Sequence, residues 1–236
     1  MTLNKIILIA IVLPCLSFQK DNRPKKTMLL NDHLEILNGN VKQIIETGID
    51  SGGSPLLMRY GDTTSFDRRG NALERRIGYG IGSRKLSLNT YTNSYNEKGM
   101  KTETIIETNK SADKNIYKYD QSGHIVKSWV ENKKKEKKFQ TSYKYDVNGK
   151  VIEIDYILSA NYGLQRLLFK YNSKGMLVEQ NLFSGNNLAD KSLFQYPSFD
   201  SKNNWTKRIC TSEFGGQTPG LHQRDTSISI RKITYY

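Results

Sequence analysis

A repeated unit built from an aromatic residue, an acid or amide and a glycine organises most of this chain. Its clearest copies are IYKYDQSGHIVKSWV (116–130), SYKYDVNGKVIEIDY (142–156) and LFKYNSKGMLVEQNLF (168–183). Looser copies lie at 66–74, 95–106 and 199–209. The residues at the glycine position follow one another at intervals of 24 to 29 residues: Gly70, Gly99, Gly123, Gly149, Gly175 and Asn203. Such a period indicates an array of similar supersecondary units.

The residue types around the glycine are those of a tight turn. Asp or Asn stands three residues before it, where the side chain can hydrogen-bond the backbone two residues further on. Glycine accepts the positive φ that closes a type I turn with a G1 bulge, and Asn, as at position 203, is the best substitute. An aromatic residue stands four positions before the glycine in every copy: Phe66, Tyr95, Tyr119, Tyr145, Tyr171 and Phe199. Each copy is therefore predicted to be a β-hairpin.

Alternation along the strands predicts a sheet with one apolar face. Tyr143 and Tyr145 fall on one side of their strand, and Lys144 falls on the other. Because a hairpin cannot bury its own apolar face, the copies are expected to join edge to edge. The predicted fold is all-β: an antiparallel β-meander of repeated hairpins that forms one curled sheet, with barrel-like closure left open. Loops are expected at 132–138, 184–190 and 214–220, and a closing strand at 226–236.

The N-terminus has the pattern of an export signal. A lysine precedes an apolar run at 6–13, and small residues follow that run at the spacing signal peptidase requires. We therefore predict a signal peptide at 1–19, a basic linker at 20–32 and one β-domain at 33–236. No second apolar run follows, so no transmembrane helix is expected after cleavage. A retained N-terminal anchor and a lipid on Cys15 are the alternatives.

The charge balance is strongly basic. The chain has 36 Lys and Arg against 23 Asp and Glu, a formal net charge of +13. In a cytosolic protein this excess would suggest a nucleic-acid partner. Export weakens that interpretation, and the basic residues are spread over many strands instead of one groove. We expect no nucleic-acid partner, and favour solubility or attraction to anionic glycans and lipid head groups.

Motifs that carry catalysis or bind metals are missing from the sequence. The histidines are isolated: His33, His124 and His222. After signal cleavage Cys210 is the remaining cysteine, so no intramolecular disulfide is expected. No nucleophile elbow and no phosphate-binding loop occurs. We therefore expect no metal, no cofactor, no catalytic residue and no enzymatic activity.

A periodic row of charged residues is the remaining catalytic option, since paired carboxylates hydrolyse glycosides. The row stands four positions after each turn residue: Glu74, Glu103, Lys127, Glu153, Glu179 and Lys207. Because lysine takes two of these places, the row is better explained as a solvated face with cross-strand ion pairs.

Aromatic side chains are the better candidates for ligand binding. Trp129 and Trp205 lie in strands just after turns, and indole rings stack on sugar faces as well as filling cores. We name both as candidate ligand-binding residues. For Tyr119, Tyr145 and Tyr171, packing in the core or between hairpins is favoured, because that position is aromatic in every copy.

The unit Y-x-Y-D-x-x-G-x-[IV]-x-[EK] resembles the YD repeat of rearrangement-hotspot (RHS) proteins. The resemblance covers about residues 65–209. NGNVKQIIET (38–47) and ITYY (233–236) look like the first and last strands of small exported YD-repeat proteins of Gram-negative bacteria. In large RHS proteins the repeats build a β-shell around a toxin, whereas this chain has few repeats and is not expected to enclose a cargo. The resemblance implies a β-meander and an association with carbohydrate or surface binding.

Three functional hypotheses follow. The first is a non-enzymatic exported YD-repeat β-protein, periplasmic, secreted or at the cell surface, that acts as a binding or scaffold module for a glycan or an envelope protein. The second is an outer-membrane β-barrel, compatible with strands of roughly 8 to 10 residues and an aromatic C-terminal residue, although the charged row leaves no continuous apolar band. The third is a glycan hydrolase.

Overall fold

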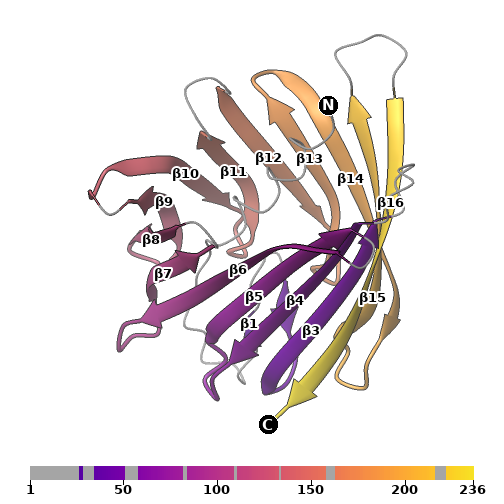
Figure 1. Cartoon of the computed structure of the whole chain (residues 1–236), viewed down its shortest axis with the longest axis horizontal. Helices are drawn as coiled ribbons and strands as arrows, with labels where there is room; N and C mark the ends of the chain where they lie inside the picture. The colour runs from indigo at the N-terminus through magenta and orange to yellow at the C-terminus, as the bar shows by residue number, and fades with distance from the viewer. Residues whose placement is uncertain are drawn as a thin grey trace.

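A closed β-barrel forms the body of the protein. The computed structural model describes residues 27–28, 35–50, 58–81, 84–108, 111–132, 134–157, 163–215 and 222–236; the predicted signal peptide and most of the linker lie outside these ranges. Within them, fourteen antiparallel strands follow one another around the barrel in chain order (Figure 1). The last strand pairs with the first, which closes the sheet. The predicted all-β meander is confirmed, and its closure is now established.

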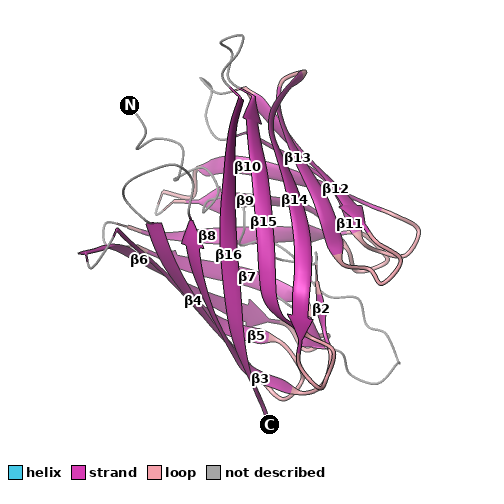
Figure 2. Cartoon of the chain, turned by 90° about the vertical axis from the view of Figure 1, so that its right-hand side faces the viewer, coloured by secondary structure: helices cyan, strands magenta, loops and turns pink. Residues whose placement is uncertain are grey.

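The barrel strands have the following bounds: β3 (Val41–Asp50), β4 (Met58–Phe66), β5 (Ala72–Ile81), β6 (Arg84–Tyr95), β7 (Lys101–Glu107), β8 (Ala112–Tyr119), β9 (Ile125–Glu131), β10 (Lys137–Tyr145), β11 (Val151–Ile157), β12 (Leu164–Tyr171), β13 (Leu177–Ser184), β14 (Asn187–Phe199), β15 (Trp205–Gly215) and β16 (His222–Tyr235). Two short strands, β1 (Thr27–Met28) and β2 (Ile36–Leu37), pair with each other outside the barrel sheet. Figure 2 shows β14 to β16 from outside, as long neighbouring strands of the wall. In the described ranges, no helix is long and apolar enough to span a membrane.

The repeat turns all lie at one end of the barrel, called the turn end below. In the turn before β9, the side-chain oxygen of Asp120 accepts hydrogen bonds from the backbone N–H groups of Ser122 and His124, both at 2.9 Å. Gly123 has φ +84°, Asn203 has φ +66°, and the register shifts by a bulge at Tyr119. These features confirm the turn predicted from the repeat.

Tyrosine hydroxyls tie successive hairpins together at the turn end. Each donates to the backbone carbonyl that opens a strand of the preceding hairpin, over 2.5 to 2.9 Å: Tyr95 to Ala72, Tyr119 to Lys101, Tyr145 to Ile125, Tyr171 to Val151 and Tyr196 to Leu177. Tyr236 donates to Phe66 and continues the series across the closing strands. At the aromatic position of the repeat, Tyr95, Tyr119, Tyr145 and Tyr171 are therefore packing residues with a defined hydrogen bond, and packing of this position was favoured from the sequence.

The inner face of the barrel holds the core. The larger apolar cluster lies on β8 to β13 and includes Tyr143, Ile154 and Phe169. A smaller cluster at the turn end joins Leu37 of β2 to residues of β3, β4 and β5. A barrel of fourteen strands is wider than its own wall side chains readily fill. The fully buried Leu37 shows that the N-terminal segment supplies part of the filling.

One predicted loop is shorter than expected. Residues 184–190 were predicted as a loop, but β13 runs to Ser184 and β14 begins at Asn187, so the connection is a two-residue turn. Gly185 takes a positive φ there, which a tight hairpin turn requires. Of the predicted 214–220 loop, residues 216–220 lie outside the described ranges.

Candidate functional site: a charged cluster inside the barrel

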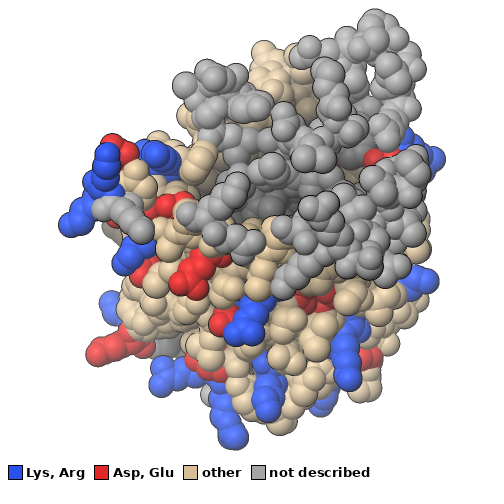
Figure 3. Space-filling view, in the orientation of Figure 1, with Lys and Arg blue, Asp and Glu red and all other residues tan. Residues whose placement is uncertain are grey.

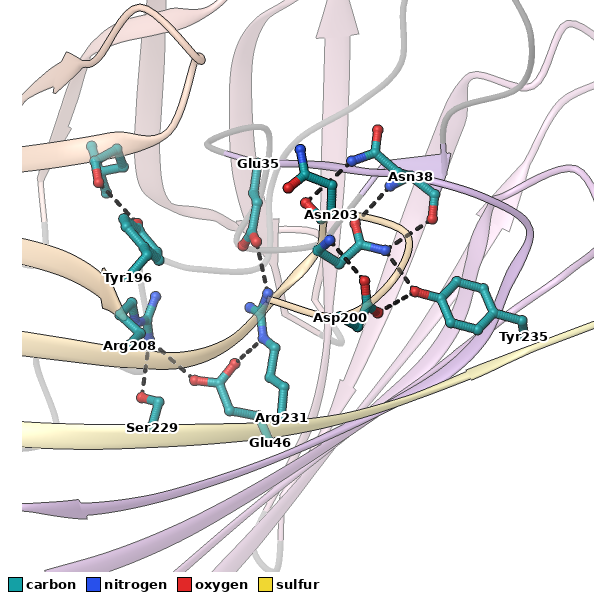
Figure 4. A network of polar contacts seen from close by, with 12 residues as sticks. Glu35, Asn38, Glu46, Tyr196, Asp200, Asn203, Arg208, Ser229, Arg231 and Tyr235 are labelled. Carbon is teal, nitrogen blue, oxygen red and sulfur yellow. Dashed lines mark hydrogen bonds and ion pairs between the residues drawn. The ribbon is translucent and has the colours of Figure 1, made fainter. Parts of the chain in front are cut away.

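Four charged side chains meet inside the barrel near its turn end. Glu46 comes from β3, Arg208 from β15, Arg231 from β16, and Glu35 from the segment just before β2 (Figure 4). Arg231 bridges the two acids, at 2.7 Å to each. Arg208 adds a second contact to Glu46 at 3.1 Å. Two cations therefore balance two anions in a space from which water is largely excluded.

The strand register explains how two of these residues meet. Glu46 and Arg231 stand directly opposite each other in the β3–β16 pair, the pair that closes the barrel. Side chains alternate across a strand, so Ile45 and Lys232 on either side of this pair face outward. Only 5% of Glu46 and 6% of Arg231 is exposed. The cluster thus sits on the inner side of the closing seam.

The cluster keeps Glu46 ionised. Burial alone would raise the pKa of this carboxyl, but the positive charges of Arg231 and then Arg208 outweigh burial and lower its pKa to about 2. Tyr60 of β4 donates to Glu46 at 2.8 Å and lies 2.5 Å from the hydroxyl of Ser229. Burial and the neighbouring Glu46 raise the pKa of Tyr60. Neither group changes its charge near neutral pH, so the cluster is unsuited to proton transfer there.

Trp205, one of the two tryptophans singled out from the sequence, lies inside this cluster and is 3% exposed. The guanidinium carbon of Arg231 lies 3.4 Å from the centre of its ring, and that of Arg208 lies 4.9 Å away. Tyr196 packs against it at a centroid distance of 5.8 Å. The indole is therefore enclosed by two cations and an aromatic ring. This position favours packing over contact with a ligand.

Trp129, the other tryptophan, lies on the outward face of β9. Its indole N–H donates to Glu131 at 2.8 Å, and the ammonium group of Lys137 lies 4.4 Å from its ring centre. The side chain is half-buried and faces solvent beside the basic connection before β10. Trp129 remains a candidate for ligand binding, and the barrel wall separates it from Trp205.

The N-terminal segment is fastened to the turn end by a second network, also seen in Figure 4. The backbone N–H of Asn38 donates to the Asn204 side chain at 2.7 Å, and the Asn204 amide donates back to the Asn38 carbonyl at 2.9 Å. Asn204 also donates to the hydroxyl of Tyr235, which donates to Asp200. Residues 35–40 are thus held to the β14–β15 turn and to the last strand.

Further polar groups line the inner face toward the other end of the barrel. Asp190 on β14 is buried, and one of its oxygens has no partner among the described groups. Burial and then Asp225 of β16 raise the pKa of Asp190 to about 6. Beside it the hydroxyls of Ser192 and Ser212 lie 2.8 Å apart. Burial raises the pKa of the Cys210 thiol, which disfavours the reactive thiolate.

The carboxylates of the charged row are distributed around the barrel. In the part of the chain that the structure describes, no three His, Cys, Asp or Glu residues are grouped to hold a metal ion. The charged row predicted after the turns does form cross-strand ion pairs on the outer surface, for example Glu153 with Lys144 at 2.7 Å and Glu179 with Lys170 at 2.8 Å. Its carboxylates are thus spread around the barrel and joined to basic partners.

Sequence reasoning did not single out the charged cluster. Glu46 and Arg231 are 185 positions apart, so no local motif joins them. One signal was present: the first and last strands carry opposite charges on the faces that also carry Ile44 and Ile233. Charges of opposite sign on the apolar faces of two strands that must pair are a sign of a buried ion pair.

Comparisons with known proteins bear on the fold. No family model and no curated protein sequence matches the chain. Among solved structures, it is similar to a porin-like protein from Bacteroides uniformis, with a TM-score of 0.53 and 10% sequence identity, over 84% of this chain and 99% of that one. A weaker similarity, with a TM-score of 0.23 and 13% identity, covers 70% of this chain and 11% of a chain in the Tc holotoxin pore of Photorhabdus luminescens. The first similarity shows a shared barrel fold.

Proposed function

We propose that the protein is an exported β-barrel of the cell envelope that acts as a non-enzymatic binding or scaffold module, with a glycan or an envelope protein as its ligand. The observation that carries this proposal is the set of ion pairs on the outer surface of β7, β8 and β10 to β13. Lys114 pairs with Glu103, and Arg166 pairs with Asp155, across neighbouring strands at 2.8 Å. Charged side chains of both signs are scattered over the described part of the face shown in Figure 3. Such a surface is stable in water.

The filled turn end supports a binding or scaffold role over that of an open channel. The tyrosine series, the buried Leu37 and the cluster around Glu46 and Arg231 occupy the inner face there. Segment 35–40 is hydrogen-bonded across the same end. A channel would need a continuous polar path with water at both ends. Ligand contacts are better sought on the outer surface.

The turn geometry also supports membership of the YD-repeat group as part of this proposal. Asp or Asn closes each turn, and the tyrosine before it joins one hairpin to another. The repeated residues thus form the turns and the contacts between hairpins. In the proposal, binding depends on the features that differ between copies, such as Trp129 and the basic connection at 132–136.

An outer-membrane β-barrel is the second candidate. Closure of an even number of antiparallel strands, and the fold shared with a porin-like protein, are compatible with such a barrel. Membrane insertion also needs an apolar outer band around the whole circumference. The ion pairs on β7, β8 and β10 to β13 interrupt such a band, and they therefore favour an envelope barrel that is in contact with water.

Cell fractionation tests the proposal. A tagged form of the chain is produced in a Gram-negative host, and cytoplasm, periplasm and membranes are separated. The expected result is export, with release of the protein by salt or alkaline washing without detergent. Retention through washing, release by detergent alone and heat-modifiable migration would instead establish the membrane-spanning barrel. A cytoplasmic protein of full length would refute both. Pull-down from envelope and peptidoglycan fractions then tests for the ligand.

A further inference from the structure

One side of the barrel carries apolar side chains on its outer surface. The outward residues of β3, β14, β15 and β16 there are Ile45, Leu193, Ile209, Ile228 and Ile230, called the isoleucine face below. Ile230 is 48% exposed, and Leu193, Ile45 and Ile228 are 37 to 39% exposed. Single exposed apolar residues are ordinary on a protein surface, but a contiguous set indicates an interaction site.

The strand register makes the isoleucine face contiguous. Ile209 stands directly opposite Ile228 in the β15–β16 pair. Ile230 stands two residues further along β16 on the same face, and Ile45 of the neighbouring β3 stands opposite Lys232. These strands form the part of the wall nearest the viewer in Figure 2. The face therefore runs across the closing seam, directly behind the buried charged cluster.

Basic residues border this face toward the turn end. Lys207 stands opposite Ile230, and Lys232 stands opposite Ile45. Neither lysine has an acidic partner among the described residues, whereas Lys144 and Lys170 on the other side of the barrel are each ion-paired. On the described outward faces of these four strands, the acid present is Glu213. It lies away from the turn end and stands opposite Lys191 and Arg224. The apolar set is thus bordered by uncompensated positive charge.

We propose that the isoleucine face docks on the surface of an anionic lipid bilayer. Apolar side chains at such a surface enter the boundary between head groups and acyl chains, while nearby lysines meet lipid phosphates. The lysine stems can lie along the apolar surface with their ammonium groups at head-group level. This inference rests on the proposed envelope location and makes the barrel a peripheral protein that lies on its side.

A second copy of the chain fits this face less well. A two-fold interface would place the same patch on both partners. Lys207 and Lys232 of one copy would then approach those of the other, and the described face offers no acid near them. A bilayer of anionic lipids provides the complementary charge over the whole face.

Vesicle co-sedimentation of the purified mature protein tests the proposal. Vesicles with about 30% phosphatidylglycerol in phosphatidylcholine are compared with vesicles of phosphatidylcholine alone, at about 0.1 M and about 1 M salt. We expect binding to the anionic vesicles and its loss at high salt. Replacing both lysines, as Lys207→Gln with Lys232→Gln, should weaken binding about 25-fold, since each basic residue near an anionic surface contributes about fivefold, or about 1 kcal/mol.

Two further variants locate the surface. Ile228→Ser with Ile230→Ser should weaken binding to the anionic vesicles at about 0.1 M salt although it changes no charge, because it removes the apolar contribution. Lys144→Gln with Lys170→Gln removes the same charge from the ion-paired side and should leave binding within about twofold of the parent. Equal loss in this control would show attraction by net charge and overturn the proposal.

Absence of vesicle binding would also overturn it. So would a parent protein that is dimeric by light scattering and becomes monomeric in the Ile228→Ser, Ile230→Ser variant, since that would assign the face to self-association. All these positions face outward, and thermal unfolding of each variant checks that it folds. Because the assay uses purified protein, a negative result would leave the exported location standing.

Discussion

The two sides of the barrel place most of their ion pairs on opposite faces. On the repeat side, β7 to β13, the inner face is apolar, with Tyr143, Ile154 and Phe169 in one cluster, and the outer face carries ion pairs. On the seam side, β14 to β16 with β3 to β5, the inner face holds ion pairs beside the smaller apolar cluster, and the outer face of β3 and β16 exposes isoleucines. A second inner pair, Arg75 with Asp62 at 2.5 Å, continues this inversion on β4 and β5.

The inversion coincides with the place where the barrel must close. Each hairpin of the repeat side pairs with a neighbour in sequence, and its register is fixed by turn geometry. β16 and β3 have no turn between them. A slip of β16 by one residue would turn Arg231 to the outside and Ile230 to the inside, and would leave Glu46 of β3 without this partner. A buried ion pair directly across this seam therefore favours one register, at the cost of desolvating two charges.

The largest expected effect comes from breaking that pair. Arg231→Met keeps much of the side-chain volume but leaves Glu46 with Arg208 alone and Glu35 without its bridging cation. Removing one partner of a buried ion pair destabilises a protein by about 3–5 kcal/mol. Urea unfolding should show a loss of this size, and hydrogen exchange should rise in β3 and β16.

Lys170→Met on the repeat side is the matched control. It removes one cation from an outward pair with Glu179, where the expected cost is below about 1 kcal/mol. A comparable loss of stability in both variants would contradict the distinction between the two sides.

The repeat side was also the part that the sequence predicted well. Asp120, Gly123 and Tyr119 act within one turn or between adjacent hairpins, so their roles follow from local geometry and spacing. The row containing Glu153 was predicted to form cross-strand ion pairs, and these pairs are confirmed.

The seam side depends on contacts that local patterns do not encode. Glu35 and Arg231 are 196 positions apart, and the segment that carries Glu35 had no repeat to define it. Closure decides which strands meet, and an alternating strand pattern says only which residues share a face. For the same reason the sequence predicted Trp205 as a ligand-binding residue, because no local pattern indicates the two arginines that enclose its ring.

The inner acid Asp190 should show the next largest effect, and it depends on pH. The folded-state pKa is raised from 3.8 to about 6, so protonation stabilises the fold. That contribution is fully present below pH 3.8 and is lost as pH rises through 6. Asp190→Asn should therefore increase the free energy of unfolding at pH 8 by about 1–2 kcal/mol, after allowance for partial solvent screening, and by little at pH 4.

Asp225→Asn provides the comparison for Asp190. It removes the nearby negative charge that helps to raise the pKa of Asp190, so the pH dependence of stability between pH 4 and 8 should become shallower. Unfolding curves at both pH values measure each effect. If Asp190→Asn stabilised the protein equally at pH 4 and 8, the carboxyl would not be titrating as proposed.

A smaller effect is expected from one tyrosine hydroxyl of the repeat side. Tyr145→Phe removes the 2.8 Å hydrogen bond to the Ile125 carbonyl and leaves that carbonyl without its hairpin-to-hairpin partner. The expected cost is about 1–1.5 kcal/mol in urea unfolding. Tyr156→Phe is the control, because Tyr156 is buried in the same cluster but its hydroxyl has no hydrogen bond among the described contacts. An equally large loss of unfolding free energy in Tyr156→Phe would contradict a specific stabilising role for the hydrogen bond of the repeated tyrosine.

The smallest effect tests whether the repeat side faces water. The hydrogen bond from Lys170 lowers the pKa of Glu179, and the two side chains lie 2.8 Å apart on the outer surface. A double-mutant cycle with Lys170→Ala and Glu179→Ala should give a coupling of about 0.2–1 kcal/mol that falls toward zero in about 1 M salt, because exposed charges are screened. A larger coupling that salt does not change would place this face in a medium of low dielectric. That outcome would favour the membrane-spanning barrel and would make the two sides alike in their surroundings.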